Sequence, residues 1–260
     1  MRPRTANLMQ KHTYRPDHLP NQRLVCTPLY LITPIEYNRT TLLRHFLNHY
    51  ARRYDNIDII IQHNGQVNLK PAMDICNEFG ARIHDWNGPY DSQSVLNQVF
   101  KLIKSAPANA WISYRDSDEF LDHRFNIREH VKQCQARRFD YIRGVLIDRI
   151  QEHGILTPIS KEDIFKQYPV SCFISKTLLK ASTNKVVACT HPNSPWDALH
   201  AHPGIQYPQI APIYHFKWDD SVVERLRARY ARYKKLGIPW ANESKRFLDH
   251  ILLHGRINND

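Results

Sequence analysis

Apolar residues follow two different spacings along the first half of the chain. Short apolar runs, typical of buried strands, alternate with segments in which apolar side chains recur every three or four residues, as on one face of a helix. The predicted strands are residues 24–33, 57–62, 81–84 and the run that begins at Trp111, and the predicted helices begin at residues 38–41, near 70 and at 91–92. This order predicts an α/β fold with a mostly parallel central sheet flanked by helices.

The second half continues the mixture of strands and helices and ends in two amphipathic helices. The patterns predict a helix over residues 127–135, strands over 141–150, 173–179 and 185–188, and a long ordered loop over 190–212. The first C-terminal helix begins at Ser221. We expect these apolar positions to face the core: Val223, Leu226, Tyr230 and Tyr233 in the first helix, and Phe247, Leu248, Ile251 and Leu252 in the second.

The length of the chain sets its domain organisation. A chain of 260 residues can bury one large core, and no internal repeat divides it. Residues 1–22 are basic and polar and contain prolines, so we predict an arm that precedes the domain. Residues 23–220 form the predicted domain, and residues 221–260 form a helical segment that packs on it.

Three acidic residues, Asp116, Asp118 and Glu119, follow the predicted strand at Trp111. Unpaired carboxylates are costly to remove from water, so such a cluster at the end of a buried strand indicates a bound cation. Asp116 and Asp118 are one residue apart and can direct both carboxylates at a single ion. The alternative is that Ser117 or Asp118 caps a helix, whose first turn favours acidic residues. Ligands of open α/β sheets bind at the carboxyl ends of strands, which favours the metal site.

The chain is strongly basic. Lysine and arginine exceed aspartate and glutamate by 36 − 25 = 11, a balance that suits nucleic acid, an anionic membrane surface or a phosphorylated small molecule. The basic residues are dispersed and no nucleic-acid-binding motif accompanies them, so we predict no specific nucleic acid as partner. The basic helix over residues 224–235 can rest on an anionic bilayer, although a solvated helix face is the more common explanation.

Cysteine usage and the N-terminus bear on the compartment. The five cysteines are an odd number with no Cys-x-x-Cys pair, which is typical of free thiols in a reducing compartment. The N-terminus lacks the apolar core of a signal peptide, and prolines interrupt the longest apolar stretch, residues 24–35. These features predict a cytoplasmic protein, and contact with an anionic bilayer would place it at the inner membrane face.

Several segments of the chain, in their order, resemble the GT-A-fold glycosyltransferases, specifically the bacterial family-2-like group with a W…DxDEFL signature. The segments are residues 111–121, 144–149, 167–169 and 214–218, and the likeness continues into the helix at 223–226. It covers about residues 24–235, and the order and spacing of the segments make it specific. The resemblance implies a GT-A-like fold and transfer of a sugar from a UDP- or GDP-sugar to a hydroxyl of a glycan or lipid-linked acceptor, in surface glycan or polysaccharide synthesis.

The same resemblance implies a metal centre. Asp118 would bind Mn²⁺ or Mg²⁺, Asp116 would contact the ion through water or the donor ribose, and His215 would be a third contact to the metal or phosphate. Oxygen ligands suit these hard cations, and the ion would offset the charge of the departing diphosphate. A hydrogen-bonded core histidine is an equal alternative for His215, and His200 and His202 are rivals in the same region.

Four charged residues are candidates for diphosphate binding and for catalysis. Lys217 and Arg149 can bind the diphosphate, with a surface charge or a structural salt bridge as the alternative. An inverting transferase needs a carboxylate base near the acceptor hydroxyl, and Asp148 and Glu119 are the candidates. A buried pair between Asp148 and Arg149 is the alternative for that aspartate.

The chain departs from the resemblance at two strand ends. Relatives carry an acidic residue after the second strand, where this chain has Asn64, and an Asn-Glu pair after the first strand, where this chain has residues 33–38. We therefore assign Thr33, Glu36 and Asn64 to the donor site and leave the nucleotide open. The rival functions are a nucleic-acid-binding protein and a non-catalytic sugar-binding protein on the same fold.

Overall fold

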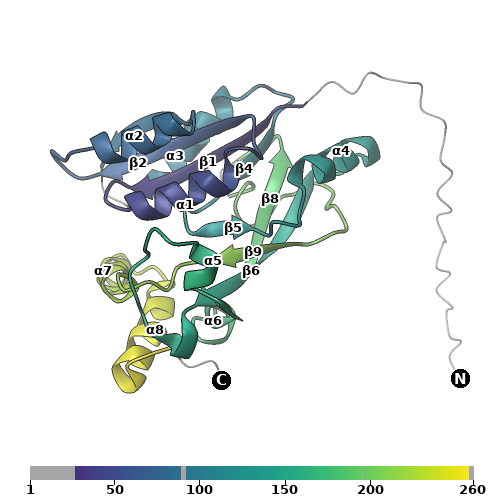
Figure 1. Cartoon of the computed structure of the whole chain (residues 1–260). Helices are drawn as coiled ribbons and strands as arrows, with labels where there is room; N and C mark the ends of the chain where they lie inside the picture. The colour runs from purple at the N-terminus through teal and green to yellow at the C-terminus, as the bar shows by residue number, and fades with distance from the viewer. Residues whose placement is uncertain (1–26, 89–91, 195, 258–260) are drawn as a thin grey trace, which may run out of the picture.

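The computed structural model describes residues 27–88, 92–194 and 196–257 (Figure 1). The predicted N-terminal arm, residues 1–22, lies outside the described residues. The described strands form a single sheet with helices on both faces. The predicted α/β class, with a central sheet flanked by helices, is confirmed.

The first half of the chain forms the parallel part of the sheet. Its strands are β1 (Leu29–Glu36), β2 (Asn56–His63), β3 (Arg82–Asn87) and β4 (Trp111–Tyr114), and the helices between them are α1 (Thr40–Tyr50), α2 (Lys70–Glu78) and α3 (Ser92–Ser105). The strands lie in the order β3-β2-β1-β4, and all three pairings are parallel. The carboxyl ends of these strands therefore meet at one edge of the sheet.

Two apolar layers explain why these strands appear in the sequence as continuous apolar runs. Leu31 and Ile35 of β1 pack in the same cluster as Phe46 of α1 and Ile75 of α2. Ile32 points to the opposite face, into the cluster that contains residues of α3. Because successive side chains of a strand alternate between faces, a sheet that is covered on both sides needs apolar residues at every position.

The second half of the chain extends the same sheet with mixed pairing. Its elements are β5 (Glu119–Leu121), α4 (Ile127–Arg137), β6 (Tyr141–Ile150), α5 (Ile164–Gln167), β7 (Val170–Cys172), α6 (Ile174–Thr177), β8 (Asn184–Thr190) and β9 (Ala211–His215). The complete order is β3-β2-β1-β4-β8-β6-β9-β5, with β7 paired to β6. Here β6 and β9 are parallel, and the other pairings are antiparallel. Strand β8, antiparallel to both of its neighbours, thus joins the parallel strands to β6, β9 and β5.

Two C-terminal helices, α7 (Val222–Lys235) and α8 (Ala241–His254), lie at the end of the molecule away from α2 and α3 (Figure 1). Leu226 of α7 and Phe247 of α8 share a core cluster with Ile150 and Trp218. The Trp218 and Phe247 rings lie 4.9 Å apart between centroids. This cluster fixes both helices against the last strands of the sheet.

The structure corrects two predictions from the sequence and excludes one alternative. Residues 173–179, predicted to be a strand, contain helix α6, because the spacing of Ile174 and Leu178 also fits one helical turn. The alternative that Ser117 or Asp118 caps a helix is wrong, because the short strand β5 begins at Glu119. Leu252, predicted to face the core, is 88% exposed, because α8 buries Ala241, Ser244 and Phe247 instead.

Two further observations concern the thiols and the membrane. Cys76, Cys134, Cys172 and Cys189 are free cysteines, and all but Cys172 are buried. Within the described ranges, no helix has both the length and the apolar character needed to cross a bilayer.

The exposure difference along α8 gives a stability prediction. Phe247→Ala is expected to lower the free energy of unfolding by about 3–5 kcal/mol, because it leaves a cavity beside Trp218. Leu252→Ala, on the same helix, should change it by less than about 0.5 kcal/mol. Urea titration followed by circular dichroism measures both, and equal losses would contradict the packing described for α8.

Candidate functional site

A large cleft opens where the parallel strands end. Its volume is about 1170 Å³, and it is lined by the ends of β1, β2 and β4, by β8 and β9, and by α7 and the start of α8. Eight carboxylate residues and six Lys or Arg residues line it, although the whole chain carries a net charge of +11. Charges in the cleft are therefore close to balanced, in contrast to the basic character of the whole chain.

Seven of the ten residues predicted from the sequence line this cleft: Glu36, Asn64, Asp116, Asp118, Glu119, His215 and Lys217. His200 also lines it. The rival His202 instead places Nε2 2.9 Å from the Thr190 carbonyl oxygen. The other three predicted residues, Thr33, Asp148 and Arg149, do not line the cleft.

Strand pairing brings Asp118, His215 and Asp148 together. His215 lies opposite Glu119 in the β5–β9 pair and opposite Asp148 in the β6–β9 pair. The Asp118 carbonyl oxygen accepts a hydrogen bond of 2.8 Å from the Phe216 amide. His215 Nδ1 lies 2.9 Å from Asp148 Oδ1, and Nε2 lies 3.7 Å from Asp118 Oδ1. One imidazole thus joins a carboxylate in the cleft to a carboxylate behind it.

The charges of this group stabilise one another. Burial opposes protonation of His215, but Asp118 and Asp148 outweigh it and raise the pKa of the imidazole. Burial also opposes ionisation of Asp118, but His215 and Arg39 outweigh it and lower the pKa of that carboxyl. His215 and the two carboxylates therefore each favour the charged form of the other.

Asp148 is fully enclosed. Its carboxylate accepts hydrogen bonds from the Ser175 amide at 2.7 Å, the Ser175 hydroxyl at 2.8 Å and Trp218 Nε1 at 2.9 Å, besides its contact with His215. These donors occupy both oxygens, and the side chain has no exposed surface. An ionised Asp148 requires the proton of His215 to lie on Nδ1, which leaves Nε2 facing Asp118.

Asp148 and Arg149 do not pair with each other. Alternate residues of β6 point to opposite faces, so Arg149 is directed away from the cluster. Arg149 Nε donates to the Tyr168 carbonyl oxygen at 2.8 Å, and Nη1 donates to Ser171 Oγ at 2.7 Å. Thr33 is buried inside β1 and also lies away from the cleft.

Lys185, which the sequence analysis did not single out, holds the other two acidic residues. Its buried Nζ lies 3.1 Å from Asp116 Oδ2 and 2.7 Å from Glu119 Oε1. Burial raises the pKa of Glu119 even though Lys185 opposes the shift. The second oxygen, Glu119 Oε2, is buried and has no hydrogen-bond partner among the described residues. A lone lysine in the apolar run Asn184–Thr190 was the signal that could have revealed this contact.

Lys217 is a cation without an anionic partner. Its ammonium group makes no hydrogen bond or ion pair within the described part of the chain, and Nζ lies 5.4 Å from the centroid of the Trp218 ring. Burial and the nearby charge of Arg229 lower the pKa of its ammonium group to about 8. A lysine in this setting gains from a bound anion, which would restore its ordinary protonation.

An ion-pair brace crosses one side of the cleft. Asp219 lies 2.5 Å from Arg39, just before α1, and 3.1 Å from Arg225 on α7. The Ser221 hydroxyl donates a hydrogen bond to the same aspartate. The brace therefore ties the end of β1 to the start of α7, although the sequence analysis singled out neither Arg39 nor Asp219.

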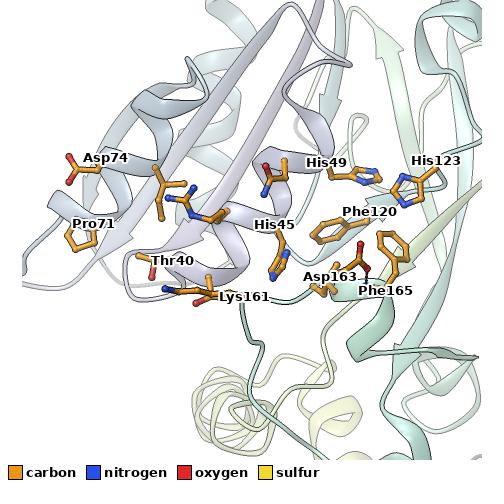
Figure 2. A pocket seen from close by; sticks show the side chains of 15 residues that line it. Thr40, His45, His49, Pro71, Asp74, Phe120, His123, Lys161, Asp163 and Phe165 are labelled. Atoms are coloured by element: carbon orange, nitrogen blue, oxygen red, sulfur yellow. Dashed lines mark hydrogen bonds between the residues drawn. The ribbon is translucent and has the colours of Figure 1, made fainter.

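A second, smaller cavity of about 610 Å³ is lined by residues of α1, α2, β5 and α5 (Figure 2). His45, His49 and His123 gather there with Phe120 and Phe165. Burial lowers the pKa of His49 to about 3, so that imidazole is neutral. None of the residues predicted from the sequence lines this cavity, and we therefore assign the candidate site to the larger cleft.

The described residues contain no group of three His, Cys, Asp or Glu side chains arranged to hold a metal ion. Asp116, one of the predicted ligands, is turned toward Lys185, while Asp118 and His215 lie beside each other. The chain thus offers a carboxylate and an imidazole, and any further ligands of an ion would come from water or a substrate.

The sequence matches no known family profile and no curated protein. Among solved structures, S. aureus TarS is similar with a TM-score of 0.40 and 12% identity, over 88% of this chain and 43% of that one. The structure of S. aureus TarS 1–349 has a TM-score of 0.40 and 13% identity, over 89% of this chain and 74% of that one. A 4-diphosphocytidyl-2C-methyl-D-erythritol synthase has a TM-score of 0.33 and 15% identity, over 81% of this chain and 86% of that one. The chain spans less than half of the longer TarS chain, and at these values the likeness assigns no family or substrate.

The contacts of Lys185 give a prediction about the site's stability. Lys185→Met is expected to cost about 3 kcal/mol, because it leaves Glu119 as a buried carboxylate without its cation. The double variant Lys185→Met/Glu119→Gln should recover at least half of that loss. Urea denaturation of the wild type and both variants measures this, and additive losses would contradict the coupling.

Proposed function

We propose that this protein is a metal-dependent glycosyltransferase that moves a sugar from a nucleotide-sugar donor to an acceptor hydroxyl. The observation that carries the proposal is the meeting of Asp118, His215 and the unpaired Lys217 at the carboxyl edge of the sheet. A carboxylate and an imidazole suit a divalent cation, and an unpaired ammonium group beside them suits a diphosphate.

The side chains of this cluster fit Mn²⁺ or Mg²⁺. Asp118 and His215 Nε2 would be the protein ligands, and Asp148 would act through His215 by holding the proton on Nδ1. When bound, the ion would neutralise negative charge on the leaving nucleoside diphosphate.

In this proposal, four other residues of the cleft bind different parts of the nucleotide-sugar donor. Lys217 binds a diphosphate oxygen, and the negative charge of the diphosphate keeps its ammonium group protonated. Asp116 remains partly exposed while it contacts Lys185, so it can reach the donor ribose or a water on the metal. Glu36 and Asn64, at the ends of β1 and β2, can hydrogen-bond the nucleoside.

Glu119 is the better candidate for the base that accepts the proton of the acceptor hydroxyl. Glu119 lines the cleft, its Oε2 has no hydrogen-bond partner within the described residues, and burial raises the pKa of this carboxyl. A raised pKa brings a carboxylate closer to the value that general base catalysis needs at neutral pH. Asp148, whose oxygens are saturated, is assigned to positioning His215.

The metal assignment is tested by nucleotide binding. Asp118→Asn should weaken the Mn²⁺-dependent binding of UDP or GDP at least tenfold, because the amide removes an anionic ligand. Asp74→Asn, an exposed carboxylate paired with Lys70 on α2, is the matched control and should bind as the wild type does. Isothermal titration calorimetry with each nucleotide, with and without Mn²⁺, measures the effect. Unchanged binding by Asp118→Asn would contradict the metal site.

Measuring both the transfer rate and Mn²⁺ binding distinguishes the role proposed for Glu119 from the role proposed for Asp148. Glu119→Gln should lower the transfer rate about 100-fold or more with little change in nucleotide affinity. Asp148→Asn should instead weaken Mn²⁺ binding roughly 10-fold to 100-fold, because His215 loses the group that orients it. Donor turnover followed by release of the nucleoside diphosphate, together with calorimetry, distinguishes the two. A reversed pattern would exchange the assignments.

A further inference from the structure

The turn between α7 and α8 exposes large apolar side chains. Leu236 is 61% exposed and Trp240 is 41% exposed. Trp196, from the loop that follows β8, is 39% exposed, and its ring centroid lies 6.0 Å from that of Trp240. Two segments far apart in the sequence therefore contribute to one exposed apolar surface.

The same segment is strongly basic. From Arg225 to Asn242 the sequence has six Lys or Arg residues and no Asp or Glu. Arg225 and Arg229 are held by Asp219 and Glu243, respectively. In contrast, Lys234 and Lys235 are exposed and make no ion pair within the described residues. The apolar side chains are thus accompanied by two cations without carboxylate partners.

This surface adjoins the mouth of the cleft. Trp196 and Trp240 are exposed and also belong to the cleft lining, as does Arg232. A partner bound to the turn would therefore lie next to the entrance of the candidate active site.

We propose that Trp196, Lys234, Lys235, Leu236 and Trp240, which we call the turn patch, bind the surface of an anionic lipid bilayer. Tryptophan rings are suited to the boundary between headgroups and acyl chains, and an exposed leucine gains by leaving water there. Lysines beside them attract anionic headgroups. Nucleic acid would use the cations but would gain little from an exposed leucine, so a bilayer fits both halves of the patch.

The structure thus relocates the membrane contact expected from the sequence. The basic helix was expected to lie on the bilayer along residues 224–235, but Leu226 and Tyr233 face the core, and Arg225 and Arg229 are paired. The last two residues of that helix, Lys234 and Lys235, and the turn after it combine exposed cations with exposed apolar side chains. The bilayer contact does not depend on glycosyl transfer; only its use in presenting a lipid-linked acceptor to the cleft rests on the proposed function.

Co-sedimentation with vesicles tests the turn patch. The wild type should bind vesicles of phosphatidylcholine and phosphatidylglycerol at least tenfold more tightly than vesicles of phosphatidylcholine alone, and high salt should weaken this binding. Lys234→Ser/Lys235→Ser should remove most of this preference, and Leu236→Ser should weaken binding at least fivefold. No binding by the wild type at 0.1 M salt would overturn the proposal.

Controls separate the patch from other exposed surfaces and from folding. Leu252→Ser/Leu253→Ser removes two exposed leucines of α8 and should leave vesicle binding unchanged. An equal loss in this variant, or normal binding by Leu236→Ser, would overturn the assignment. A loss of oligonucleotide binding without a loss of vesicle binding in the lysine variant would make the turn a nucleic-acid surface instead.

Measuring nucleotide binding beside vesicle binding distinguishes failure of the turn-patch proposal from failure of the proposed transferase function. Neither Leu236 nor the two lysines line the cleft, so Mn²⁺-dependent nucleotide binding by these variants should match the wild type. Vesicle binding without nucleotide binding by the wild type would support the turn patch and refute the transferase assignment. The converse result would refute only the turn patch.

Discussion

The buried contact between His215 and Asp148 is the interaction on which the candidate site depends. It requires β6 and β9 to pair in one register, since a shift of one residue would direct His215 to the other face of the sheet. The same strand β9 pairs with β5 and so sets the position of Asp118. The pairing of β9 with its two neighbours therefore determines where the His215 and Asp118 side chains lie. Ser175 and Trp218 donate the remaining hydrogen bonds to the Asp148 carboxylate.

Charge compensation in the site follows two routes. Asp118 is stabilised chiefly by His215, whereas Glu119 and Asp116 share the ammonium group of Lys185. Each arrangement leaves one group unsatisfied within the described chain: Lys217 in the first and Oε2 of Glu119 in the second. Glu119 Oε2 is buried, and buried polar atoms rarely stay without partners, whereas Lys217 is half-buried and lacks an anion beside it. These two groups are accordingly the places where an anion and a hydroxyl would be received.

The sequence was sufficient for the parallel half of the fold, because helices cover both faces of its strands and each strand is a continuous apolar run. It also indicated Asp118, since local charge at the end of such a run is conspicuous. It could not reveal Lys185, whose partners lie 69 and 66 positions earlier in the chain, at Asp116 and Glu119. The three-residue strand β5 was too short for its alternation to be recognised. The strand over residues 141–150 was predicted, and its alternation implies opposite directions for Asp148 and Arg149, but the partners that each side chain meets lie on distant segments.

The short strand β5 also limits how the protein can change during evolution. Glu119 contributes to the large cleft and Phe120 to the smaller histidine-lined cavity, so adjacent residues serve opposite sides of the sheet. Insertion or deletion of one residue here would exchange the two sides and place an aromatic ring where a carboxylate is needed. The loop between β8 and β9 has no such alternation to preserve and can vary in length at lower cost. Substrate preference can therefore diversify through that loop while the spacing of the acidic strand end stays fixed.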